Sequence, residues 1–181
     1  MLSACQVDTA GDGSLELVDP ALDWRGGQGW LQTGIDWNPP PRVIEAHENG
    51  VEVPLTLMVR VSRHHGLFAS VDETRRYRFT VRYLPMVRNF QLTRPGDEAL
   101  ENFPRLSMLT DALAEPGRWP LGLDEDARET RRWQVQARVD LDRSGLPSPM
   151  RLPAWFDPQW RGNSGWTTWI IEPQDAGSGD A

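Results

Sequence analysis

Long stretches of the chain alternate between apolar and polar residues with a period of two. In the clearest stretch one face carries Val51, Val53, Leu55, Leu57, Val59 and Val61, and the other carries Glu52, Thr56, Arg60 and Ser62. The pattern returns where Tyr77, Phe79, Val81 and Tyr83 oppose Arg76, Arg78, Thr80 and Arg82, and again at Trp133, Val135, Ala137, Val139 and Leu141. Because successive side chains of a strand point to opposite faces of a sheet, each stretch predicts a strand with one buried face.

Shorter segments at 14–19, 29–37, 87–93 and 165–171 bring the number of predicted strands to seven. Strands that each have one polar face are typical of antiparallel sheets. The chain is therefore predicted to be mainly β: an antiparallel β-sandwich, either immunoglobulin-like or an open barrel, with turns at His64-His65-Gly66 and Leu84-Pro85-Met86. The side chains expected to be buried together are Val53, Leu55, Leu57, Phe79, Val81, Val135 and Val139.

Two segments depart from this period and predict one or two short helices. The first runs from Pro40 to His47 and is followed by Asn49-Gly50, where glycine suits the position just beyond a helix end. The second covers residues 104–114, with Pro104 in the first turn and Pro116-Gly117 closing it. Residues 144–163 are rich in Pro, Gly and Trp, and we expect an ordered loop packed on the sheet.

The length of 181 residues suits a single domain, which we place at residues 15–172 between a linker (1–14) and a flexible polar tail (173–181). All 19 basic residues are Arg, and the net charge of −7 argues against a nucleic-acid partner. The charge is uneven. Residues 55–95 hold eight Arg against two acidic residues, a balance of +6, whereas the rest of the chain has a balance of −13.

The single cysteine, Cys5, excludes an internal disulfide and a Cys-based zinc site. Leu2-Ser3-Ala4-Cys5 has the form of a bacterial lipobox, in which the cysteine receives the lipid, and a small, polar linker follows it. An export signal also needs an apolar stretch before the box, and only Met1 precedes it. The match is therefore the end of a signal whose true start lies upstream, the remnant of a trimmed signal, or chance. On the first reading we expect a periplasmic lipoprotein, tethered to the outer membrane by lipidated Cys5 and touching the membrane through that anchor only.

Three stretches resemble a proteobacterial family of exported proteins that is catalogued as a domain of unknown function, the group numbered four-three-nine-zero. They are Glu48-Asn49-Gly50-Val51 with Pro54-Leu55, then Arg118-Trp119-Pro120-Leu121, and then the run from Leu152 to Trp169. The likeness covers roughly residues 15–172. It implies export and a gene neighbourhood that often includes a membrane sensor kinase of the nitrogen-regulation type, and it implies no catalytic residues.

The common catalytic motifs are missing from the sequence: it has no Gly-x-Ser-x-Gly elbow, no His-Glu-x-x-His and no phosphate-binding glycine loop. His64 or His65 could bind a metal loosely with Asp72 or Glu73, but solvent-exposed turn residues are the simpler interpretation. His47 among its acidic neighbours reads as surface charge, and Asp124-Glu125-Asp126 as an acidic loop. We therefore expect no enzyme, no metal and no cofactor.

Nine Trp are the compositional surprise. Trp155, Trp160, Trp166 and Trp169 lie within fifteen residues, and Trp24, Trp30 and Trp37 lie in the predicted N-terminal strands. Exposed aromatic rings bind sugars and proteins, because a flat apolar face buries much area at little entropic cost. The alternative, which we favour, is that most of them plug the ends of the sandwich and only one or two are partly exposed.

Arg76, Arg78 and Arg82 share the polar side of one predicted strand. Guanidinium groups in a row could meet carboxylate or phosphate bidentately, or they could pair with acids on neighbouring strands. With Trp160 and Trp166 they are the candidate partner-binding residues. The sequence thus predicts a non-enzymatic envelope domain that binds another protein, such as the periplasmic segment of a sensor kinase. The alternative is a module that binds glycans or lipid headgroups through exposed Trp and Arg.

Overall fold

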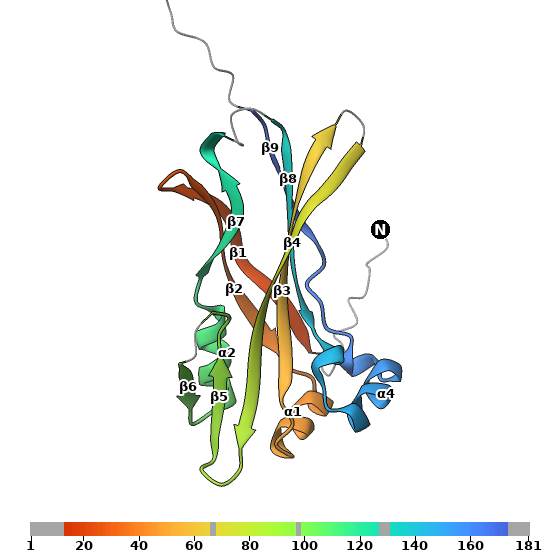
Figure 1. The fold of residues 1–181 in the computed structure, drawn as a ribbon. Coiled ribbons are helices and arrows are strands. Elements are labelled where there is room, and N and C mark those ends of the chain that lie inside the picture. The colour runs from red at the N-terminus through yellow and green to blue at the C-terminus, as the bar shows by residue number, and fades with distance from the viewer. Residues whose placement is uncertain (1–12, 66–67, 97–98, 127–130, 174–181) are drawn as a thin grey trace, which may run out of the picture.

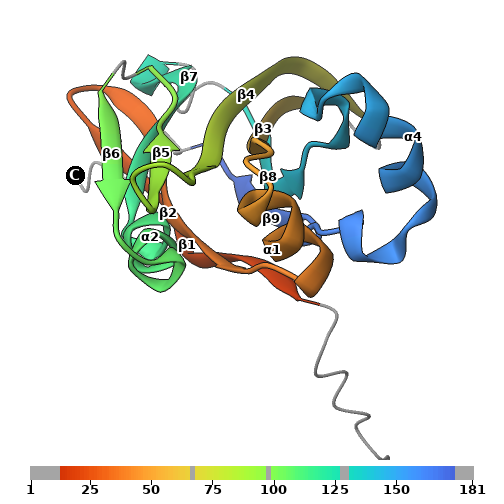
Figure 2. The same ribbon diagram turned by 90° about the horizontal axis from the view of Figure 1, so that it is seen from below.

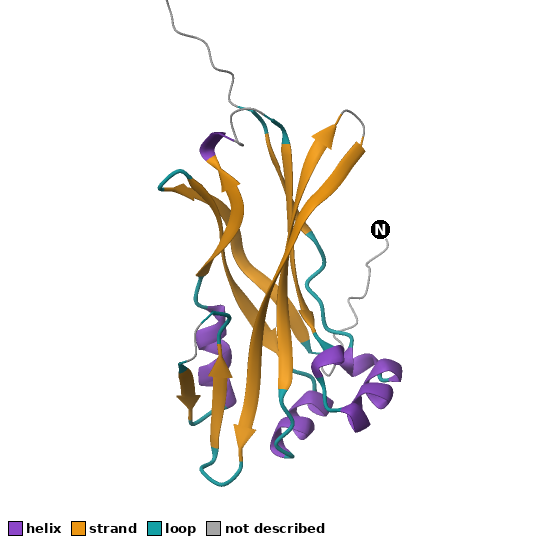
Figure 3. Ribbon diagram, viewed as in Figure 1, coloured by secondary structure: helices purple, strands orange, loops and turns teal. Residues whose placement is uncertain are grey.

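The computed structural model describes residues 13–65, 68–96, 99–126 and 131–173, with the backbone alone at residues 64, 65 and 68–72. Two antiparallel sheets pack face to face, and most of the helical segments lie toward one end of the pair (Figures 1 and 3). The smaller sheet has the order β1 (Ser14–Arg25), β2 (Gln28–Asn38) and β7 (Gly117–Asp124). The larger has the order β6 (Leu100–Phe103), β5 (Asn89–Thr93), β4 (Phe68–Leu84), β3 (Val53–His65), β8 (Trp133–Leu141) and β9 (Thr167–Ile171).

The predicted mainly β class is confirmed, in the form of an open sandwich. One core lies between the sheets, and it receives the alternate side chains of the long strands. All seven residues expected in the core are at most 1% exposed: Val53, Leu55, Leu57, Phe79, Val81, Val135 and Val139. The smaller sheet contributes Leu31, Ile35 and Leu121 from the opposite side. None of the helices in the described ranges is both long and apolar enough to cross a bilayer.

Local breaks in the alternating pattern explain why β1 was predicted too short and why β6 and β7 were not predicted at all. Strand β1 continues to Arg25, six residues past its expected end, because a register shift between Val18 and Ala21 absorbs Asp19 and Pro20. Strand β7 contains Pro120, which a strand tolerates at the edge of a sheet, where β7 lies. Strand β6 has four residues, too few to show a period.

Helix α1 (Pro41–Glu48) ends as expected at Asn49-Gly50. Gly50 has φ +72°, its amide donates to the His47 carbonyl, and the Val51 amide donates to the Ala46 carbonyl. These two bonds make the Schellman arrangement that satisfies the last carbonyls of a helix. Helix α2 (Leu106–Ala114) confirms the second predicted helix and packs Leu109 and Leu113 into the core.

The expectation of a loop at residues 144–163 is wrong. The segment forms a 3₁₀ turn η1 (Arg143–Gly145), helix α4 (Ser148–Phe156) and a second 3₁₀ turn η2 (Pro158–Trp160). Its prolines concealed the helix. Pro149 lies in the first turn, where a missing amide proton has no consequence, and Pro153 removes a single bond from a two-turn helix. Seen from below, α4 lies on the side of the larger sheet that faces away from β1 and β2 (Figure 2).

Candidate functional site

The predicted arginine row lies on the outer face of the larger sheet, across strands β4, β3 and β8. Strand pairing arranges the outward side chains in rungs. Arg78 of β4 lies opposite Thr56 of β3, which lies opposite Asp140 of β8. One rung away, Arg76, Met58 and Arg138 follow one another in the same order. We call the outward side chains Arg60, Arg76, Arg78, Arg82 and Arg138 the Arg face.

Only part of the Arg face is neutralised by acids. Arg78 pairs with Asp142 at 2.8 Å, and Arg138 pairs with Asp140 at 2.8 Å. Arg76 and Arg82 are exposed and form no ion pair with any residue that the structure describes. Arg78 is therefore neutralised by an acid within the fold, whereas Arg76 and Arg82 have no acidic partner among the described residues.

Trp166 joins this face. The Arg60 guanidinium lies 4.3 Å from the centre of its ring and the Arg138 guanidinium 4.6 Å, so both make cation–π contacts with it. Trp160 does not join them. It is 5% exposed and packs beneath α1 and α4, which leaves it no free ring face for a partner.

The tryptophans as a set are more exposed than expected. Trp37, Trp133 and Trp160 are buried, whereas Trp155 is 54% exposed. The other five are half-buried: Trp24, Trp30, Trp119, Trp166 and Trp169. Three of the nine are thus in the core, and Trp24, Trp119 and Trp169 pack against it while remaining partly exposed, against an expectation of one or two partly exposed rings.

A pocket of about 470 Å³ lies beside the Arg face, between the outer side of the sheet and α4. Its floor comes from Thr56 and Met58 of β3, and Arg76 and Arg78 of β4 line one side. The opposite wall is Trp155 of α4, and the Arg143 guanidinium lies 4.3 Å from the centre of its ring. Asp140 and Asp142 complete the polar lining.

Thr56 is the unusual residue of this pocket. It is 7% exposed, and its Oγ1 is buried without a hydrogen-bond partner among the described residues. A buried hydroxyl that makes no hydrogen bond destabilises the fold by about 1–3 kcal/mol. Such groups are uncommon in folded proteins, and a ligand atom is one of the few things that can satisfy them.

We expect Thr56→Val to raise the free energy of unfolding by about 1 kcal/mol, because it exchanges the unsatisfied hydroxyl for a methyl group of similar size. Urea denaturation followed by Trp fluorescence measures the change. Thr168→Val on β9 is the control, because its hydroxyl is exposed and takes part in a hydrogen bond with Gln136. A loss of stability in Thr56→Val would show that the hydroxyl has a partner in solution.

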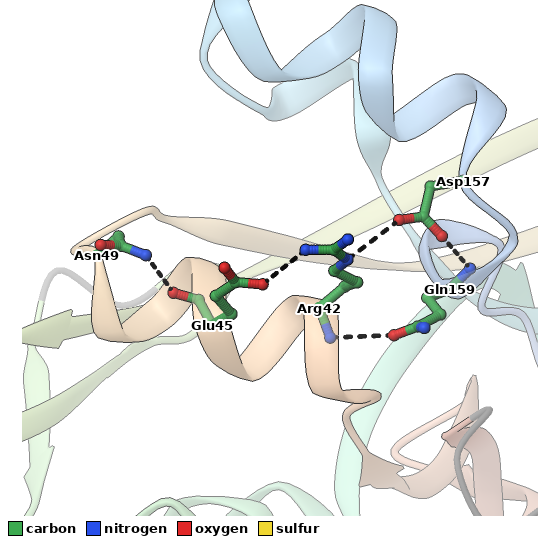
Figure 4. Close-up of polar contacts among 5 residues, drawn as sticks. All are labelled: Arg42, Glu45, Asn49, Asp157 and Gln159. Carbon is green, nitrogen blue, oxygen red and sulfur yellow. Dashed lines mark hydrogen bonds and ion pairs between the residues drawn. The ribbon is translucent and has the colours of Figure 1, made fainter.

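Polar contacts between α1 and η2 hold the segment that carries α4 (Figure 4). The backbone amide of Arg42 donates to Gln159 Oε1 at 3.0 Å, and the Arg42 side chain lies 2.9 Å from Glu45 and 3.8 Å from Asp157. The Asp157 carboxylate in turn accepts a hydrogen bond from the backbone amide of Gln159 at 3.0 Å. These bonds fix the end of α4, and with it the Trp155 wall of the pocket.

The remaining candidates do not form a second site. His47, which the sequence presented as surface charge, is fully buried between Trp37 and Phe90. Cys5 and the side chains of His64, His65 and Asp72 lie outside the described residues. Within the ranges that the structure covers, no three His, Cys, Asp or Glu side chains lie close enough together to hold a metal ion.

Sequence reasoning found the Arg face and missed the pocket. Alternation along β4 was sufficient to align the arginines, because that pattern is local. Thr56 looked like an ordinary polar position of β3, and Trp155 lay in a segment expected to be a loop. The available signal was the spacing of Arg151 and Trp155, four residues apart, which is one helical turn.

A family model described as a domain of unknown function, DUF4390, matches residues 13–170. This match confirms the resemblance that the sequence indicated. Neither a curated protein nor a solved structure matches the chain.

Proposed function

The chain belongs to the DUF4390 family, and from this premise we propose that it is a non-enzymatic binding domain of the cell envelope. On this proposal the Arg face binds an acidic segment of another envelope protein, for which a sensor kinase's periplasmic segment is a candidate. Support for the location comes from the lipobox-like Leu2-Ser3-Ala4-Cys5. The observation that carries the binding role is the pair of exposed arginines, Arg76 and Arg82, that form no ion pair with a described residue.

The positive charges of the row oppose one another electrostatically. Arg76 and Arg78 lie two residues apart on β4, about 6.6–6.8 Å, and repel modestly in water, whereas Arg82 lies four residues beyond Arg78. An acidic segment lying along the row would relieve this repulsion. Arginine also suits carboxylates particularly well, because its planar group donates two parallel hydrogen bonds.

The charge of the whole chain adds specificity. The net charge is −7, yet β3, β4 and the adjoining segment, residues 55–95, carry a balance of +6. Four of these eight arginines lie on the Arg face, so an acidic partner is attracted there while the net charge of the chain repels it. Such asymmetry steers association and makes it sensitive to salt.

A second candidate function has one specific observation in its favour. The pocket beside the Arg face has a half-exposed aromatic wall, Trp155, and both cationic and anionic side chains within reach of it. Aromatic rings beside charged hydrogen-bonding groups suit a sugar or a lipid headgroup. The protein partner remains the first proposal, because Arg82 and Trp166 lie outside the pocket and extend the surface beyond a small ligand.

We expect the double variant Arg76→Gln/Arg82→Gln to lose its partner. The full chain, immobilised on beads, is exposed to a detergent extract of membranes from the native host, and retained proteins are eluted by rising salt and quantified by mass spectrometry. A protein retained by the unaltered chain should be reduced about tenfold or more, because two charge-assisted contacts are lost. The free energy of unfolding should change by less than about 0.5 kcal/mol, as for ordinary surface substitutions.

The matched control is Arg105→Gln/Arg131→Gln, which removes the same charge from exposed positions away from the Arg face. Retention should survive in this variant. Equal retention by the unaltered chain and the Arg76/Arg82 variant, or an equal loss in both double variants, would contradict the proposal. A partner whose retention does not respond to salt would contradict it as well.

A further inference from the structure

The pocket beneath Trp155 has an unbalanced charge. Three guanidinium groups line it, those of Arg76, Arg78 and Arg143, against the carboxylates of Asp140 and Asp142, which leaves a balance of +1. Arg78 is engaged by Asp142, and Arg143 lies on the Trp155 ring. Arg76 is the lining guanidinium that has neither an ionic partner nor an aromatic contact among the described residues.

The polar and apolar groups of the pocket converge on one kind of ligand. The buried, unpartnered hydroxyl of Thr56 lies on the rung next to Arg76, so both groups are on the same strip of the sheet. Met58 separates Arg76 from Arg138 and supplies an apolar surface, and Trp155 supplies a second apolar surface to the same pocket. A ligand here meets a cation, a hydroxyl and two apolar surfaces.

We propose that this pocket binds one carboxylate group that is attached to an apolar body. This inference rests on the proposed function: the ligand is an acidic side chain of the partner's segment, followed by an apolar residue. The carboxylate accepts two hydrogen bonds from Arg76 and one from the Thr56 hydroxyl. The neighbouring apolar side chain packs between Met58 and Trp155.

The single unengaged arginine of the pocket favours a carboxylate over a phosphate. One carboxylate carries a single negative charge and matches Arg76, because Arg78 is already paired with Asp142 and Arg143 lies on the Trp155 ring. A phosphate monoester carries about −1.5 to −2 charges at neutral pH and would be repelled more strongly by Asp140 and Asp142. A carboxylate has about four acceptor sites, of which a bidentate arginine uses two, so it can also accept a hydrogen bond from the Thr56 hydroxyl.

The test is an NMR titration of the full, ¹⁵N-labelled chain with three blocked dipeptides. Acetyl-Glu-Phe-amide carries the proposed group, acetyl-Gln-Phe-amide is its neutral match, and acetyl-phosphoserine-Phe-amide carries the phosphate. The signals followed are the Trp155 indole N–H, assigned with Trp155→Phe, and the amides of Thr56 and Met58. The Glu dipeptide should shift these signals to saturation, and the other two should bind at least about tenfold more weakly.

Variants separate the pocket from the rest of the Arg face. Arg76→Gln should weaken binding of the Glu dipeptide about tenfold or more, and Thr56→Val several-fold, whereas Arg82→Gln should leave it unchanged because Arg82 does not line the pocket. Equal binding of the Gln dipeptide, unchanged binding by Arg76→Gln, or shifts spread evenly over the Arg face would overturn the inference.

Two results distinguish this inference from the proposed function. Partner retention that falls in Arg76→Gln/Arg82→Gln but survives in Thr56→Val and Trp155→Ala would overturn the pocket and support the Arg face. Retention that is indifferent to Arg76 and Arg82, together with specific binding of the Glu dipeptide, would overturn the partner role. In that case the carboxylate would belong to a free small molecule.

Discussion

Replacing Leu57 by alanine is expected to lower the free energy of unfolding by about 2–5 kcal/mol, the range for truncating a large buried aliphatic side chain. Leu57 is 0% exposed and lies on β3, with Tyr77 of β4 on one side and Val139 of β8 on the other. Because strands hold it on both sides, the cavity left by the truncation can close only a little. The result should therefore fall in the upper half of the range.

Chemical denaturation followed by far-UV circular dichroism gives the number. The matched control is Leu152→Ala, the same truncation on α4 at a side chain that is 67% exposed, and it should stay within about 0.5 kcal/mol of the unaltered chain. A loss below about 1 kcal/mol in Leu57→Ala would mean that the two sheets do not enclose β3 as the structure shows.

Acidification from pH 6.5 to pH 4 is expected to remove about 3 kcal/mol of stability through His47 alone, at 1.36 kcal/mol per pKa unit. The His47 side chain is 0% exposed, and neither ring nitrogen has a hydrogen-bond partner among the described residues. Burial disfavours the charged imidazolium and lowers the pKa of His47 from 6.5 to about 4, and the opposing effect of the nearby Val51 backbone on this pKa is the smaller one.

The sign follows from which state takes up the proton. Below pH 6.5 the unfolded chain protonates His47, while the folded chain keeps it neutral until about pH 4. Stability from this residue is therefore fully present above pH 6.5 and falls as the pH falls through that window. The opposite trend would require a folded pKa above 6.5, and burial of the imidazole lowers this pKa instead.

The measurement compares the free energy of unfolding of His47→Leu with that of the unaltered chain at several pH values between about 7.5 and 4. The difference between the two free energies of unfolding should grow as the pH falls, because only the unaltered chain loses stability through His47. The carboxylates titrate alike in both proteins, so their contribution cancels. At neutral pH the leucine variant should be at least as stable, since it removes two unsatisfied buried nitrogens. His64→Gln/His65→Gln is the control and should retain the loss of stability on acidification. A constant difference across the range would contradict the buried, neutral His47.

The local pattern of the sequence was sufficient wherever neighbouring residues alone decide the conformation. Alternation located β3, β4 and β8 and their buried residues, and Gly50 marked the end of α1, because a period of two or a left-handed backbone is a local property. The arginines of β4 were aligned correctly for the same reason. The local pattern was less successful at β1 and β7, where Pro20 and Pro120 interrupt the period of two without ending the strand.

The chain's own pattern determined the fold class, the long strands and the outward row of Arg76, Arg78 and Arg82. Tertiary structure alone decided what surrounds them. It buried His47 between Trp37 and Phe90 and brought Trp155 to the same pocket as Thr56 and Met58. It also paired Arg78 with Asp142 and left Arg76 without an ionic partner in the part of the chain that the structure describes. These contacts join residues tens of positions apart in the chain. A sequence period reports which face of a strand a side chain occupies, whereas burial, pairing and a pocket depend on which other segment packs against that face.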